Sequence, residues 1–178
     1  MALRRARVLL LAVAALALLT GGRSLAQSGP QLHTKVGGVS SETLVVASPE
    51  AVADPALAMV RVMIAPGASI PEHRHTGTQI AAIISGDLTY SVDTGEVDLY
   101  RLGSTPGKDA PTVLGPGTTT VLRPGDAIVE HPGSLHQATN AGSAPVLLFS
   151  SILFPSAAGA TVYATTAATP EPEASPGP

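Results

Sequence analysis

The residues of this sequence that are best suited to chemistry are histidines, and four of the five fall into two clusters. The first pair, His73 and His75, stands between Pro71 and Gly77, which are typical turn residues. Alternate side chains of a strand share one face, so a strand ending here would direct both imidazoles into the same space. A His-x-His pair is nevertheless common by chance, and it is equally typical of polar residues at a strand end.

The second cluster offers a third imidazole. His136 follows the turn sequence Pro-Gly-Ser-Leu and leads into a segment that is expected to form a strand. If this strand lies antiparallel beside the one that holds His73 and His75, the three imidazoles converge. Three neutral imidazoles at a metal–nitrogen distance of about 2 Å would suit a divalent transition metal, and Fe, Mn, Zn, Ni and Cu are all candidates.

These histidines lie in a segment, residues 42–162, whose pattern predicts an all-β domain. Short runs rich in Val, Ile, Leu and Thr are interrupted by Gly and Pro turns about every ten residues. The pattern predicts strands at 43–48, 56–65, 78–85, 87–93, 97–102, 118–123, 126–131, 135–141 and 145–154. Helical periodicity is absent apart from one turn at 48–55, and residues 103–120 are expected to form a long loop. Many short strands favour a sandwich or a barrel over a parallel α/β sheet.

The start of the chain differs in composition from this domain. Residues 1–26 combine Arg4, Arg5 and Arg7 with a short apolar run and the small-residue cleavage sequence Ser-Leu-Ala. This pattern is typical of a secretory signal peptide, and the alternative is an uncleaved membrane anchor. Because the apolar run is short for a membrane span, we expect an exported protein without a stable span after cleavage, located in the periplasm, outside the cell or at the cell surface.

The segments that flank the predicted domain carry no strand pattern. Residues 27–41 are rich in Gly and Ser and predict a flexible arm, and residues 163–178 form a Pro-rich tail that predicts disorder. The predicted domain ends at residue 162, and the tail begins at residue 163.

Charge and cysteine content exclude several classes of function. Four of the ten basic residues lie in the signal segment, so six remain against thirteen acidic residues, a formal net charge of −7. An acidic domain without a basic patch is poorly suited to nucleic acid or to an anionic membrane surface. The chain has no cysteine, which rules out disulfides, zinc–thiolate sites and thiol catalysis. A homodimer is a further expectation, since pairing would cover an exposed edge strand.

The spacing around the histidines matches two signatures of a known family. The signatures run Gly67-x5-His73-x-His75-x3-Gln79-x6-Gly86 and Gly125-x5-His131-x-Gly133-x2-His136-x3-Asn140. With both in the correct order, the chain resembles a small, single-domain cupin over about residues 56–154. The resemblance implies a double-stranded β-helix, or jelly-roll barrel, with a metal inside. His73, His75 and His136 match the three histidine ligands of the family, and Gln79 occupies the place of the usual glutamate ligand.

Two positions depart from the family pattern. Gln79 replaces a glutamate, which would leave the site with about one more unit of positive charge, a stronger Lewis acid and a weaker hold on the metal. Gln79 is either a weak fourth ligand or a hydrogen-bonding residue beside the ligands. His131 replaces a proline of the second signature, and its place before Pro132 and Gly133 favours a rim position or a proton relay.

The other polar residues near the signatures have structural interpretations. Asp126 and Glu130 are expected to be surface or turn carboxylates, and alternation places Arg74 on the solvent side of its strand. Tyr90 is expected to border the pocket. No nucleophile or separate general base stands out, so a bound metal would have to supply the chemistry.

The predicted function is that of an exported, metal-binding cupin acting on a small molecule at a three-histidine centre. The resemblance makes a dioxygenase the first reaction type to consider, with isomerases and decarboxylases behind it. The alternative is a cupin that binds or stores a small molecule without catalysis, since this fold serves many functions.

Overall fold

The computed structural model describes residues 33–49, 55–105 and 107–164. These residues form thirteen strands and no helix. The strands are β1 His33–Val36, β2 Val39–Ala47, β3 Pro55–Ile64, β4 Ser69–His75, β5 Thr78–Ser85, β6 Leu88–Thr94, β7 Val97–Tyr100, β8 Thr112–Leu114, β9 Thr118–Leu122, β10 Ala127–Glu130, β11 Leu135–Thr139, β12 Val146–Pro155 and β13 Thr161–Tyr163. In this part of the chain no helix is long and apolar enough to cross a membrane.

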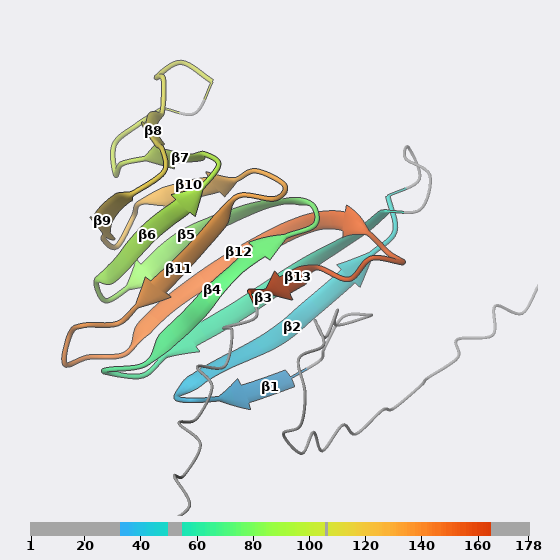
Figure 1. The fold of residues 1–178 in the computed structure, drawn as a ribbon, viewed down its shortest axis with the longest axis horizontal. Coiled ribbons are helices and arrows are strands. Elements are labelled where there is room, and N and C mark those ends of the chain that lie inside the picture. Colours follow the sequence, from blue (N-terminus) through green and yellow to red (C-terminus); the bar gives the residue numbers. More distant parts are fainter. Residues whose placement is uncertain (1–32, 50–54, 106, 165–178) are drawn as a thin grey trace, which may run out of the picture.

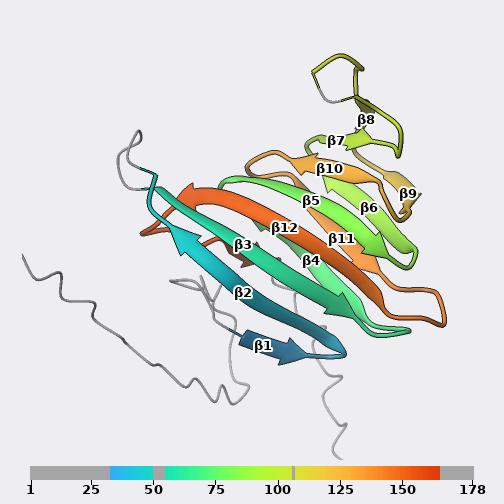
Figure 2. The ribbon, with the colours of Figure 1, turned by 180° about the vertical axis from the view of Figure 1, so that it is seen from behind.

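The strands make two antiparallel sheets (Figure 1). The larger sheet has eight strands in the order β1-β2-β3-β12-β5-β10-β7-β8, and the smaller has five in the order β13-β4-β11-β6-β9. Figure 1 looks onto the smaller sheet, and Figure 2 shows the larger one from behind. In both sheets, strands that are far apart in sequence lie side by side, as in β3-β12-β5-β10. This is the jelly-roll arrangement predicted from the sequence.

The core fills the space between the two sheets, because strands of both sheets alternate buried and exposed side chains. Leu88, Tyr90 and Val92 of β6 point inward from the smaller sheet, and Ile83 of β5 and Leu148 of β12 do so from the larger. Burying a large apolar side chain contributes roughly 1.5–3 kcal/mol. This core therefore replaces the disulfides that the sequence lacks.

All nine strands expected from the sequence are present, with ends shifted by a few residues. The segment of His73 and His75 also forms a complete strand, β4, and the expected loop at 103–120 contains the short strand β8 and the start of β9. Of the helical turn expected at 48–55, the structure describes residues 48, 49 and 55, and none of them is helical. Residues 50–54 lie outside the described part.

The expectation of a flexible arm at residues 27–41 was wrong for the C-terminal part of this segment. β1 and β2 form a hairpin in which Val36 pairs with Val39 across Gly37 and Gly38. Both glycines have positive φ, 56° and 81°, as a two-residue hairpin turn requires. The glycines that suggested an unstructured segment thus form a turn. Similarly, Tyr163 belongs to β13 and not to the tail.

Three expectations fall on residues outside the described part of the chain. They are the signal peptide at 1–26, the arm at 27–32 and most of the Pro-rich tail, residues 165–178.

Candidate metal centre

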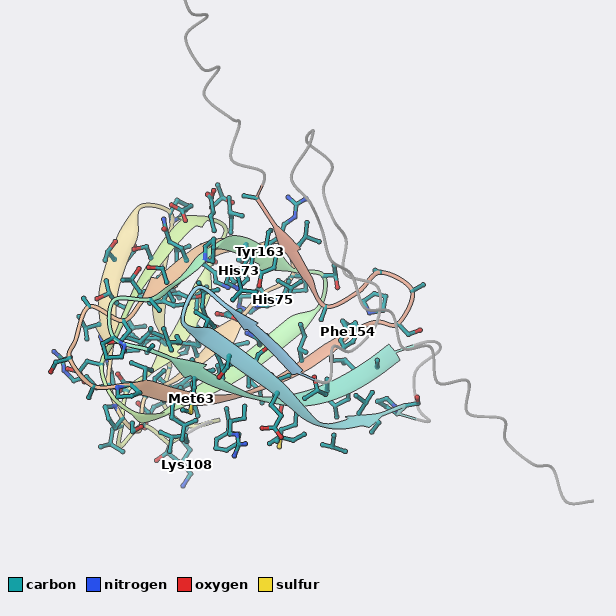
Figure 3. All side chains as sticks on the ribbon, turned by 90° about the horizontal axis from the view of Figure 1, so that it is seen from below. Met63, His73, His75, Lys108, Phe154 and Tyr163 are labelled. Carbon is teal, nitrogen blue, oxygen red and sulfur yellow. The ribbon has the colours of Figure 1, made fainter. Side chains whose placement is uncertain are left out.

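Strand pairing brings the three signature histidines together. His73 of β4 and His136 of β11 are direct partners in the antiparallel ladder, and His75 lies two residues further along the same face of β4. All three are buried, and each offers a ring nitrogen within 4.8 Å of the others. Figure 3 shows His73 and His75 close together, with Tyr163 beside them.

The turn after β4 is held in place by a close backbone contact. Gly77 lies against β12, where an added Cβ would come within 1.7 Å of the Leu153 carbonyl oxygen. Only glycine fits at this point, because backbone atoms cannot move aside as a flexible side chain can. The glycine therefore lets β4 turn tightly into β5 directly after the two histidines.

Each histidine is oriented by a hydrogen bond at Nδ1. His73 Nδ1 lies 2.8 Å from the Pro71 carbonyl, and His136 Nδ1 lies 3.0 Å from the Ser134 carbonyl. His75 Nδ1 lies 3.3 Å from the Ala160 carbonyl and 3.2 Å from the Thr161 hydroxyl. A carbonyl oxygen only accepts, so Nδ1 of each ring carries the proton and Nε2 keeps its lone pair. Such bonds orient the histidine ligands of metal sites.

The Nε2 atoms of His75 and His136 are buried and have no hydrogen-bond partner. A buried polar atom without a partner costs about 1–3 kcal/mol, and in a native structure it points to a missing ligand or ion. A divalent metal fits here, because it would accept both lone pairs and that of the neighbouring His73.

The surroundings also favour the neutral form of the His73 and His136 imidazoles. Burial, reinforced by the neighbouring imidazoles of His136 and His75, lowers the pKa of His73 to about 3. Burial likewise lowers the pKa of His136, although the Glu130 carboxylate opposes this effect. Neutral imidazole is the form that binds metal, so the cluster is ready for an ion at neutral pH.

A carboxylate that the sequence analysis placed at the surface lies in the same site. Glu130 is buried, with 3% of its surface exposed, because it follows Ile128 on the inward face of β10. Its Oε2 lies 3.3 Å from His75 Nε2, and its Oε1 lies 3.2 Å from His136 Nε2. The expectation of a surface or turn carboxylate was therefore wrong for Glu130.

Two donors hold this carboxylate. The Gln79 amide nitrogen donates to Oε2 at 2.5 Å, and the Tyr90 hydroxyl donates to Oε1 at 2.7 Å. Burial alone would raise the pKa of Glu130, but His75, His136 and Tyr90 together hold it below its usual range. Burial and the same carboxylate raise the pKa of Tyr90, which keeps its proton. Of the two interpretations of Gln79, the structure favours the hydrogen-bonding one.

The remaining residues singled out in the sequence lie away from the cluster. His131 is half-exposed and its Nε2 is 3.2 Å from Asp98 Oδ2, as expected for a rim residue. Arg74 is exposed. Asp126 is a turn carboxylate, but a buried one that accepts bonds from Arg101 and two backbone N–H groups. Burial opposes its ionisation, yet these donors lower its pKa.

Sequence reasoning missed a second contributor, the C-terminal strand β13. It pairs with β4, so that Thr161 lies opposite His75 and Tyr163 opposite His73. The Tyr163 ring lies 5.6 Å from the His73 ring, centre to centre. Three residues beside a Pro-rich tail carry too short a pattern to be recognised as a strand.

Comparisons with known proteins give one family match. Residues 60–101 match the family model of the cupin domain. A search of curated protein sequences found no match.

Several solved structures are similar in fold. An RmlC-like cupin from Shewanella frigidimarina is 18% identical, with 70% of this chain and 83% of that chain covered and a TM-score of 0.45. An oxalate oxidase is 22% identical, with coverage of 80% and 62% and a TM-score of 0.49. The oxalate decarboxylase of Bacillus subtilis, a protein with Mn(II) centres, is 19% identical, with coverage of 75% and 30% and a TM-score of 0.50. At these identities the likeness concerns the fold.

Proposed function

We propose that this chain is a cupin, that it binds a divalent transition metal through His73, His75 and His136, and that it acts on a small molecule there. The observation that carries the proposal is the pair of buried Nε2 atoms without hydrogen-bond partners, at the centre of a cluster whose Nδ1 atoms are all engaged. Such an arrangement leaves two buried ligand atoms without a hydrogen bond.

The metal is one of Fe, Mn, Zn, Ni and Cu, and when bound it supplies Lewis-acid or redox chemistry to a coordinated small molecule. The chain's own residues orient the site. Backbone carbonyls fix the imidazole rings, while Gln79 and Tyr90 hold the Glu130 carboxylate beside them. Tyr163, which is partly exposed, stands beside His73 where a small molecule could contact it.

The reaction we propose is a dioxygenase-like oxidation of a small organic molecule by molecular oxygen. The described side chains that contact the three imidazoles or Glu130 include the Gln79 amide, the Tyr90 and Tyr163 phenols and the Thr161 hydroxyl, and the sequence has no cysteine. This set favours chemistry at a metal over attack by a protein nucleophile. The amino-terminal pattern supports export of the protein.

The test is oxygen uptake by the chain without residues 1–26, purified without a histidine tag. The protein is loaded in turn with Fe(II), Mn(II), Ni(II), Cu(II) and Zn(II) and supplied with a panel of small chelating acids, enols and phenols. We expect uptake with one redox-active metal and none with Zn(II) or with the His136→Ala variant. Metal-dependent binding of a panel compound without oxygen uptake would contradict the oxidation and select the binding or storage function.

A further inference from the structure

We propose that Glu130 is the anionic ligand of this metal centre, supplied from the strand next to the one on which the cupin pattern places its glutamate. The inference rests on the proposed metal binding by the three histidines. It assigns Gln79 a different task, that of a positioning residue for the carboxylate. The site then keeps the ligand set of three imidazoles and one carboxylate, although position 79 has lost its charge.

Strand register explains how the carboxylate can change strands. Glu130 of β10 and Gln79 of β5 are direct partners in the antiparallel ladder. Both side chains point into the space between the sheets, and their heads are in hydrogen-bond contact. A carboxylate on either position therefore enters the same space, opposite the imidazoles of the smaller sheet.

The distances match those between ligands of one ion. Two ligand atoms, each about 2.1 Å from a metal and about 90–110° apart, lie roughly 3.0–3.4 Å from each other. The separations between Glu130 oxygens and the Nε2 atoms of His75 and His136 are 3.3 and 3.2 Å. The Glu130 carboxylate therefore lies at ligand-to-ligand distance from two of the imidazoles, with Oε2 facing His75 and Oε1 facing His136.

The protonation pattern leaves room for a cation between these groups. With Nδ1 carrying the proton, Nε2 of His75 and of His136 presents a lone pair to a carboxylate oxygen. Two acceptors that face each other at this distance repel, unless a cation lies between them. Because both Nε2 atoms lack a hydrogen-bond partner, a metal satisfies the histidines and Glu130 together.

The exchange at position 79 fits the same interpretation. Gln79 donates its amide N–H to Glu130, whereas a glutamate there would bring a second carboxylate against the first. Like charges in such contact disfavour ionisation of one of them. Together with the Tyr90 hydroxyl, the amide points the carboxylate towards the imidazoles. The additional positive charge expected from the sequence is therefore offset by Glu130.

The test compares metal binding by four forms of the chain without residues 1–26: the unsubstituted chain, Glu130→Gln, the exchange Gln79→Glu/Glu130→Gln, and Asp98→Asn. Affinities for Mn(II) and Co(II) are measured by competition with a chelator, and the Co(II) absorption spectrum reports the ligand set. Asp98→Asn is the matched control, because Asp98 is a carboxylate that contacts a histidine outside the cluster, His131.

We expect Glu130→Gln to weaken binding by about tenfold or more and to change the Co(II) spectrum, while Asp98→Asn changes neither. The exchange variant returns a carboxylate to the same space and should recover most of the affinity. If Glu130→Gln alone does not fold, the metal affinity of the exchange variant still tests the inference. Unchanged affinity and spectrum in Glu130→Gln, or an exchange variant no better than Glu130→Gln, would overturn the inference. If the unsubstituted chain binds none of Mn(II), Co(II), Fe(II), Ni(II), Cu(II) and Zn(II), the proposed function fails, and the inference fails with it.

Discussion

At the scale of single residues, the site depends on hydrogen bonds that keep ligand atoms free. Each Nδ1 of the three histidines is engaged by the chain, and both oxygens of Glu130 receive a donor. Lone pairs are thereby directed towards one another in a buried space. Without a bound ion such a cluster lowers the stability of the fold, because the lone pairs of the imidazoles and of the carboxylate face each other with little water to screen them.

The Tyr90 hydroxyl tests the positioning of the carboxylate. Tyr90→Phe keeps the ring that stacks at 5.4 Å on His136 but removes the donor to Glu130. We expect a loss of about 2 kcal/mol in unfolding free energy, since the bond is to a charged group, and a several-fold weaker metal affinity. Urea unfolding and metal titration measure the two effects. Tyr163→Phe, at a partly exposed hydroxyl, is the control, and equal effects in both variants would contradict this role.

The pKa of His73 predicts how the metal-free protein responds to acid. Burial and the neighbouring imidazoles lower this pKa to about 3, against an ordinary value of about 6.5. Between these values the unfolded chain binds a proton that the folded chain does not, so stability falls as the pH falls from about 6.5 towards 3. Urea unfolding at pH 7, 5.5 and 4.5 measures the loss, which should be smaller in His73→Gln. The same loss in that variant would show that His73 is not its source.

At the scale of strands, the two sheets contribute different parts of the site. β4 and β11 of the smaller sheet bring the histidines, whereas β5 and β10 of the larger sheet bring Gln79 and Glu130. The short edge strand β13 lies against β4, and its Thr161 hydroxyl and the carbonyl of Ala160, which precedes it, contact His75 Nδ1. Orientation of His75 thus depends on a segment outside both family signatures.

A pair of truncations tests this dependence. Ending the chain after residue 158 removes β13, and ending it after residue 164 keeps it. Since β13 is an edge strand, we expect the shorter chain to fold with a lower melting temperature and to bind metal about tenfold more weakly. The longer chain serves as the control. Equal metal affinities of the two chains would show that β13 does not position His75.

The strands and the histidines could be predicted from the sequence, and the carboxylate could not. Alternation of apolar residues and turn residues revealed the main strands, and the spacing of His73, His75 and His136 revealed the cluster. Glu130 was expected to be a surface or turn carboxylate, since glutamates are rarely buried unless they are paired. Its inward direction was visible in the alternation with Ile128, but its contact with Gln79 depends on the register between β10 and β5, which one sequence does not specify.

The β1–β2 hairpin shows another limit of sequence patterns. Gly37 and Gly38 are as typical of a flexible segment as of a tight turn, and the choice depends on pairing with β3. Glycine content alone cannot distinguish these cases, because a tight turn requires positive φ and a flexible segment samples it freely.

At the scale of the whole molecule, metal binding and folding should be coupled. The three histidines lie on the smaller sheet, and Glu130, the further ligand that we propose, lies on the larger one, so an ion bound by all four would join the two halves of the sandwich. A ligand that binds only the folded chain stabilises it by about 2.7 kcal/mol at a concentration of a hundred times Kd. The formation of a homodimer stays a prediction, which sedimentation of the chain without residues 1–26 would test.

The most direct measurement of the central claim is metal content together with thermal unfolding of the tag-free chain. We predict close to one divalent transition metal per chain, a clear fall in melting temperature when a chelator removes it, and recovery when the metal is returned. His136→Ala should lose both the bound metal and the temperature shift. Two results would contradict the account. One is a chain that binds none of the five metal ions, and the other is a His136→Ala variant that keeps the full metal content and the full shift in melting temperature.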